Sequence, residues 1–142
     1  MESGTGRFAQ LIVIDASTIV GAAFRQGSVP WRGLMRARER DLVAMSEAVA
    51  DEIREVLGRP KFAPVLTLRR QAEIVALLFT DAHWFVPTIR VTDCRDPGDD
   101  KYLELVLAAN ATVLVSSDRD LLSLHPWRGV PVLRPSDYLA LA

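Results

Sequence analysis

The sequence has few of the features that would place the protein in a disulfide-bonded or membrane-bound class. Its 142 residues include a single cysteine, Cys94, which excludes an intrachain disulfide framework and a four-cysteine zinc site. The stretch 11–24 is apolar but shorter than the roughly 20 residues of a membrane-spanning helix, and Asp15 lies in its middle. We therefore expect no membrane segment and, because one thiol fits a reducing compartment, a cytoplasmic protein.

The sequence also lacks an excess of charge of either sign. Lys and Arg number 17 and Asp and Glu 18, for a net charge of −1, which argues against strong non-specific binding to nucleic acid. Hydrophobic residues make up 49% and charged residues 25% of the chain, as in an ordinary globular protein. We expect one domain over residues 1–142, with residues 1–9 as a frayed terminus because they are small, polar and unpatterned.

Short apolar runs alternate with amphipathic segments along the chain. Strands are predicted at Leu11–Ile14, Leu42–Met45, 84–86 (with a possible extension over 89–91), 111–115 and 130–133. Helices are predicted over 31–40, from Ser46 to Gly58, from Thr67 to about Ala82, from Asp99 or Asp100 onward, over 118–124, and after a cap at Ser136. This alternation predicts a three-layer α/β/α sandwich around a mostly parallel sheet of about four to five strands.

Acidic residues occur where the predicted strands end or where a nearby helix begins. Asp15 follows the first strand, and Asp118 follows the strand 111–115 across two serines. Asp100 lies where an aspartate-rich loop turns into a helix, and Glu52 lies about two turns into the helix after Ser46. Because function collects at the carboxyl ends of parallel strands, we expect these four side chains to meet there.

Several carboxylates in one cleft repel each other, and burial raises the pKa of each, so a divalent cation is the natural occupant of such a cluster. An all-oxygen set of ligands suits Mg²⁺ or Mn²⁺, and one or two such ions can promote cleavage of a phosphodiester. Each acid also has a simpler explanation. Asp15 and Asp118 could cap helices, Glu52 could be a solvated helix residue, and Asp99 and Asp100 could be turn formers.

Basic residues are unevenly distributed. Residues 25–70 hold ten Lys or Arg against six acids, a net of +4, whereas residues 71–142 hold six against ten, a net of −4. All but two of the 17 basic residues are arginine, the residue that suits bidentate phosphate contacts. Ordinary solvated helix faces would give the same pattern. The candidates for contact with RNA phosphates are Arg25, Arg32, Arg36, Arg59 and Lys61.

The motifs VIDASTIVGA, SEAVADEIREVLGRPKF, CRDPGDDKYLELVLAANATVLVSSDRDLL and GVPVLRPSDYL occur in an order that resembles PIN-domain proteins. The closest likeness is to the VapC-like toxins of bacterial toxin–antitoxin systems. The resemblance runs from about Leu11 to the C-terminus. It implies that the acidic site consists of Asp15, Glu52, Asp100 and Asp118, with Asp100 favoured over Asp99 by its spacing to Asp118.

Two supporting residues follow from the same resemblance. Ser116 stands where the family commonly has a threonine that orients a water or ligand. The family's usual Asp-Thr-Asn after the first strand is here Asp15-Ala16-Ser17, so a contact made by asparagine would fall to Ser17, and Asp99 remains a further supporting acid.

The resemblance implies a Mg²⁺- or Mn²⁺-dependent endoribonuclease that is inhibited by a cognate antitoxin protein and is often a homodimer. The altered Ala16-Ser17 pair motivates an alternative, a catalytically degenerate interaction or RNA-binding module on the same scaffold. A phosphoaspartate enzyme fits poorly, because Ser17 stands where that chemistry needs a second aspartate. The predicted substrate is therefore RNA, with hydrolysis of its phosphodiester bonds as the reaction.

Overall fold

A parallel sheet forms the centre of the molecule in the computed structural model, which describes residues 9–141. The strand order is β3-β2-β1-β4-β5, and every neighbouring pair is parallel. The strands are β1 (Leu11–Ile14), β2 (Leu42–Met45), β3 (His83–Trp84), β4 (Val113–Val115) and β5 (Val132–Leu133). The predicted α/β architecture is confirmed, whereas the predicted frayed terminus lies, apart from Ala9, outside the described residues.

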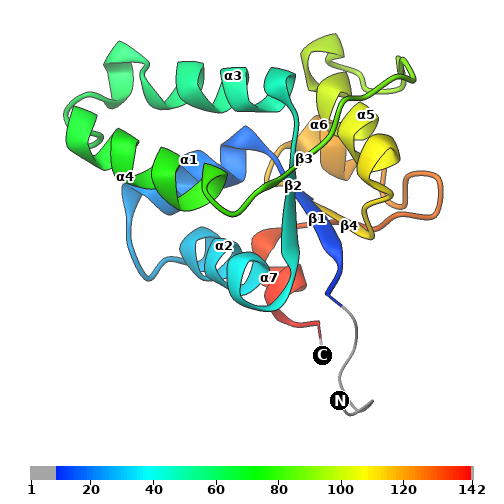
Figure 1. Ribbon diagram of the computed structural model, residues 1–142, viewed down its shortest axis with the longest axis horizontal. Helices are drawn as coiled ribbons and strands as arrows, with labels where there is room; N and C mark the ends of the chain where they lie inside the picture. The colour runs from blue at the N-terminus through cyan, green and yellow to red at the C-terminus, as the bar shows by residue number, and fades with distance from the viewer. Residues whose placement is uncertain (1–8, 142) are drawn as a thin grey trace.

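Helices cover both faces of this sheet (Figure 1). Helix α5 packs on β1, β2 and β4 from one side, and α2 packs on β2, α1 and α7 on the other. The α-helices are α1 (Ala16–Phe24), α2 (Val29–Arg40), α3 (Glu47–Leu57), α4 (Leu68–Phe79), α5 (Asp100–Ala109), α6 (Arg119–Leu122) and α7 (Pro135–Leu139). Two 3₁₀ helices are η1 (Pro60–Phe62) and η2 (Pro97–Asp99).

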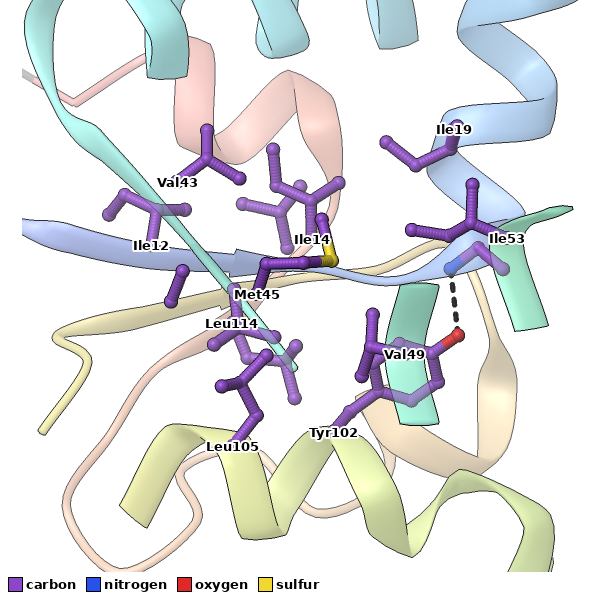
Figure 2. Close-up of a cluster of buried hydrophobic side chains, with 14 of the residues drawn as sticks. Ile12, Ile14, Ile19, Val43, Met45, Val49, Ile53, Tyr102, Leu105 and Leu114 are labelled. Atoms are coloured by element: carbon purple, nitrogen blue, oxygen red, sulfur yellow. Dashed lines mark hydrogen bonds between the residues drawn. The ribbon is translucent and has the colours of Figure 1, made fainter. Parts of the chain in front are cut away.

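The hydrophobic core lies on both faces of the central strands. Figure 2 shows Ile12 and Ile14 of β1 with Val43 of β2 and Ile19 of α1 above them and Tyr102 and Leu105 of α5 below. These side chains are at most 5% exposed. Strands of a parallel sheet are buried on both faces, which explains their continuous apolar runs. The packing fixes the position of the strand ends.

The strand register aligns the residues that follow the strands. Ile14 pairs with Val115, and Met45 pairs with Trp84. The backbone N–H of Asp15 donates to the carbonyl of Val115 at 3.0 Å, and that of Phe85 donates to Met45 at 2.8 Å. The first residues beyond the strands therefore form a row along the carboxyl edge of the sheet.

Helix α1 was not predicted, because the apolar stretch was interpreted as a buried strand that ends at Asp15, and residues 16–24 were given no element of their own. The chain instead leaves β1 at Asp15, whose carboxylate accepts from the Thr18 N–H at 3.1 Å and caps the new helix. An aspartate followed three residues later by threonine was the available signal. Small residues such as Ala22 and Ala23, both buried, allow α1 to pack closely on its neighbours.

Other boundaries differ locally. Strand β3 ends at Trp84. Beyond the hydrogen bond from the Phe85 N–H to Met45, the segment 86–91 forms no strand, since Pro87 has no N–H to donate to a sheet ladder. The prediction that Ser136 caps the last helix was wrong. That helix begins at Pro135, with Arg134 at the cap position, because proline is well suited to the first helical turn.

Within residues 9–141, no helix combines the length and the apolar character needed to cross a bilayer.

Candidate active site

Asp15 is the most deeply buried acid of the predicted site, with 3% of its surface exposed. Its carboxylate accepts hydrogen bonds from the hydroxyls of Ser17 at 2.8 and 2.9 Å, Thr18 at 3.0 Å and Ser116 at 2.7 Å. Burial raises the pKa of Asp15, while these donors oppose the rise. The hydrogen bonds hold the carboxylate at the end of β1.

Ser116 links Asp15 to the next strand and to Asp118. Its side chain is fully buried, and its hydroxyl oxygen also accepts from the Asp118 N–H at 2.9 Å. The Asp118 carboxylate accepts from the Leu121 N–H at 3.2 Å and caps α6. The capping role, one of the two alternatives that the sequence offered for Asp118, is confirmed, and it leaves the side chain at the carboxyl edge of the sheet.

Asp99 lies next to Asp118 rather than apart from it. Burial, a hydrogen bond between the two carboxyl groups and the charges of Asp118, Asp96 and Glu52 raise the pKa of Asp99 to about 7. Carboxylate oxygens of Asp96, Asp99 and Asp120 lie within 4.8 Å of one another. Asp99 therefore connects Asp118 to a compact acidic cluster at the start of α5.

Asp100, which the spacing favoured over Asp99, is oriented differently. It is buried, with 8% exposed, and its carboxylate accepts from the backbone N–H of Cys94 at 2.8 Å. This contact fixes the loop that precedes η2. Of the two neighbouring aspartates, Asp99 is the one in contact with Asp118.

Glu52 reaches the site from α3. The hydroxyl of Tyr102 donates to its carboxylate, and Lys101 forms an ion pair with it at 3.3 Å. Tyr102 accepts in turn from the Ala16 N–H at 3.1 Å, the bond drawn in Figure 2. Burial and the Glu52 carboxylate raise the pKa of Tyr102, so its hydroxyl stays protonated and ties α3 and α5 to the start of α1.

The structure thus brings Asp15, Asp118, Asp99 and Glu52 together through short chains of contacts. No role at the site was predicted for Tyr102, so its function as a connector was missed. Its position three residues after Asp99, at the start of the same helix, was the available signal.

A pocket of about 750 Å³ opens beside these acids. Its lining includes Asp118 and Asp120, the hydroxyls of Ser17 and Ser117, and two exposed arginines, Arg95 and Arg119. Sequence analysis missed both arginines because they belong to the acidic half of the chain. Their closeness to the acids follows from the loop before η2 and from the start of α6.

The predicted phosphate-binding residues are more scattered. Arg25 follows α1 at the end opposite to Asp15, and Arg32 is an exposed residue of α2. Arg59 is paired with Glu55 at 2.8 Å, and exposed Lys61 lies over the Phe62 ring.

The Arg36 side chain is buried and makes its contacts inside the protein. It is 7% exposed, donates to the carbonyl of Tyr138 and lies 4.8 Å from the centre of that ring. These contacts give Arg36 a structural role that attaches α7 to α2.

Comparison with known proteins places this geometry in a family. A PIN-domain family model matches residues 11–120, whereas the sequence matches no curated protein. Among solved structures, PAE2754 from Pyrobaculum aerophilum has a TM-score of 0.59 at 18% identity, over 96% of this chain and 92% of that chain. VapBC2 from Rickettsia felis, solved bound to a DNA fragment from its promoter, has a TM-score of 0.58 at 10% identity, over 86% of this chain and 96% of that chain. PIN domains are generally nucleases and usually bind divalent metals, and this chain belongs to the PIN-domain family.

Proposed function

We propose that the chain is a divalent-metal-dependent endoribonuclease whose site consists of Asp15, Glu52, Asp99 and Asp118. The observation that carries the proposal is the contact between Asp99 and Asp118, linked through Ser116 to Asp15 at the carboxyl edge of the sheet. Like charges that close together are unfavourable without a proton or a cation between them. Asp100 holds the loop backbone, and we assign it a positioning role.

The donor atoms suit Mg²⁺ or Mn²⁺, since all are carboxylate or hydroxyl oxygens. Asp99 and Asp118 would hold the ion, with Asp15 and Glu52 binding it directly or through water. A divalent cation at this place supplies Lewis-acid chemistry, because it acidifies water and stabilises charge that develops on phosphate oxygens.

The remaining side chains keep these acids in place. The three hydroxyls of Ser17, Thr18 and Ser116 all donate to the Asp15 carboxylate, and Tyr102 orients Glu52. Ser17, which stands where the family usually has an asparagine, therefore makes the contact with Asp15 that was expected of it. This contact supports a working site rather than a degenerate one.

Arg95 and Arg119 are the phosphate contacts that this geometry supports best. Both line the pocket that also contains Asp118, and guanidinium groups bind phosphate oxygens in a bidentate manner. They would hold phosphates that flank the cleaved bond, while the phosphate of the cleaved bond itself would lie at the acids.

Adjacent aspartates offer a matched test of the proposal. Asp99→Asn and Asp118→Asn should each abolish Mn²⁺-dependent cleavage of single-stranded RNA. Asp100→Asn should retain most activity, because an asparagine oxygen can still accept from the Cys94 N–H. Circular dichroism would verify that the variants are folded. Full activity of Asp99→Asn or of Asp118→Asn would refute the assignment.

Calorimetry distinguishes the proposed nuclease from the alternative, a non-catalytic interaction module. Titration of the wild-type chain with Mn²⁺ should show binding that Asp99→Asn weakens strongly. Absence of binding at millimolar Mn²⁺, together with absence of RNA cleavage, would favour the interaction module.

We propose further that the chain is the toxin of a toxin–antitoxin pair, held by a protein antitoxin and present as a homodimer. The VapBC2 likeness supports this context at the level of the fold. Exposed Phe24 and Val65, at 41% and 55%, line a pocket of about 450 Å³ at the start of α4, together with the charged side chains of Arg69, Arg70 and Glu73, and we propose this mixed apolar and charged surface as the docking site. Expression in a bacterial host should arrest growth, and Asp99→Asn should relieve the arrest.

A further inference from the structure

A second pocket lies at the carboxyl edge of the sheet, on the side of β3. Its volume is about 310 Å³. The lining residues come from the start of α3 and from the end of β3 with the segment after it: Ser46, Glu47, Ala48, Trp84, Phe85, Val86 and Pro87. None of them belongs to the acidic site described above.

Trp84 forms an exposed aromatic wall of this pocket. Its side chain is 47% exposed, although tryptophan is among the residues that gain most from burial. The indole is nevertheless held in place, because the Phe79 ring meets it edge-on at 5.7 Å between centroids and at 77°. The Arg54 guanidinium lies over the second ring of this pair, 4.7 Å from the centre of the Phe79 ring. The pocket therefore presents a fixed aromatic surface to solvent.

The strand register sets how far this pocket is from the acids. Met45 pairs with Trp84, and β2 lies between β3 and β1. The end of β3 is therefore two strand spacings, about 10 Å, from Asp15 along the same edge. The segment after β3 then leads directly to the loop that carries Asp99 (Figure 1).

Helix α3 supplies a second, shorter link. Ala48, which lines the pocket, and Glu52, which belongs to the acidic site, are four residues apart on α3. Residues at that spacing share one face of a helix, about 5–6 Å apart, and helical side chains lean toward the N-terminus. The pocket and the acidic site are thus neighbours along one helix face.

We infer that the Trp84 pocket binds an unstacked base of a single-stranded RNA whose backbone crosses the acids, an inference that rests on the proposed ribonuclease function. Bases of single strands stack on exposed aromatic side chains in sequence-tolerant recognition. The carboxylates of Glu47 and Glu52 disfavour a phosphate in this pocket and leave it to the neutral base. Arg95 and Arg119, on the β4 side, would take phosphates at the opposite end of the path.

The test combines a tryptophan variant with a modified substrate. Trp84→Ala should raise KM for a short single-stranded RNA about tenfold or more, the loss expected for one stacked base, with kcat nearly unchanged. Trp84→Phe should restore much of the affinity. Leu68→Ala, which truncates an 83% exposed side chain on α4, is the matched control and should have no effect. Thermal denaturation would show that each variant is folded.

Binding of a fluorescein-labelled RNA in EDTA, without cleavage, gives an independent measurement. Replacing one base by an abasic site should weaken binding to the wild type and leave binding to Trp84→Ala unchanged. If the chain cleaves RNA but Trp84→Ala keeps the wild-type KM and affinity, the subsite is wrong and the nuclease proposal stands. If the wild type neither cleaves nor binds RNA, both fail. If Trp84→Ala impairs only binding of a protein partner, the pocket serves that partner and the inference is overturned.

Discussion

Replacing Asp99 by asparagine should stabilise the metal-free protein at pH 8. The folded chain places the Asp99 carboxyl beside Asp118, Asp96 and Glu52 and raises its pKa to about 7 from an ordinary value of 3.8. At pH 8 the carboxyl is ionised in both the folded and the unfolded chain. Only in the folded chain is it close to other negative charges, so its ionisation destabilises the fold.

The size of this effect follows from the pKa difference. A rise from 3.8 to about 7 corresponds to about 4 kcal/mol at 1.36 kcal/mol per tenfold change in proton affinity. Because Asp99 is only partly buried, solvent screening reduces this to about 2 kcal/mol. For a domain of this size we expect Asp99→Asn to raise Tm by about 6 °C at pH 8.

The effect has a defined pH dependence. Between the unfolded pKa of 3.8 and the folded pKa of about 7, the folded chain binds more protons at Asp99 than the unfolded chain does. The stability of the wild type therefore falls as pH rises through this window, and the loss is complete above about pH 7. The advantage of Asp99→Asn should be largest at pH 8 and should shrink toward pH 4.

Thermal denaturation in EDTA at several pH values measures this difference. Glu39→Gln, which neutralises an exposed acid on α2, is the control and should leave Tm unchanged at each pH. Equal stability of Asp99→Asn and wild type at pH 8, or an advantage that does not change with pH, would refute the reasoning. Added Mn²⁺ should reverse the order, because only the wild-type carboxylate can bind it.

Three further substitutions test other contacts. Tyr102→Phe should cost about 1–3 kcal/mol in urea denaturation, because the buried Ala16 N–H loses its acceptor; unchanged stability would contradict this. Arg36→Ala should lower the free energy of unfolding by about 2 kcal/mol, through loss of its hydrogen bond and cation–π contact with Tyr138, and unchanged RNA affinity would confirm that its role is structural. Arg119→Gln should raise KM for RNA at constant kcat and reduce the salt slope of binding by about 1; a changed kcat with constant KM would argue against a phosphate contact.

Local patterns predicted the sheet well, because each central strand is a short β-branched or apolar run buried on both faces. Helices were predicted to start at Ser46 and at Thr67, and the side chains of both residues cap these helices by accepting from the Val49 and Arg70 N–H groups. Helix α1 was missed because its residues are as apolar as the strand before it. Hydrophobicity alone cannot distinguish a short buried strand from a short buried helix.

Contacts between residues far apart in the sequence could be predicted less well than local structure. The ring of Tyr102 lies on the buried face of its helix, but nothing in the local sequence indicates what its hydroxyl contacts. That hydroxyl gains its role from Glu52 and Ala16, 50 and 86 residues away in the sequence. Arg95 and Arg119 were likewise hidden by the local excess of acids, because charge counts along a segment average over side chains that face different directions.

The choice between Asp99 and Asp100 shows where sequence spacing reaches its limit. Consecutive residues at the start of a helix point about 100° apart, so of two adjacent aspartates only one can face a given site. The sequence separation from Asp118 is 19 residues for Asp99 and 18 for Asp100, and a difference of one residue does not show which of the two side chains lies beside Asp118. What decides is the loop before η2, which folds so that the Cys94 N–H reaches Asp100 at 2.8 Å. The hydrogen bond from this buried donor commits the Asp100 carboxylate to the loop, whereas the neighbouring Asp99 carboxyl lies beside Asp118. A backbone donor five residues upstream of Asp99 is therefore the reason why we propose Asp99, and not Asp100, as the metal ligand.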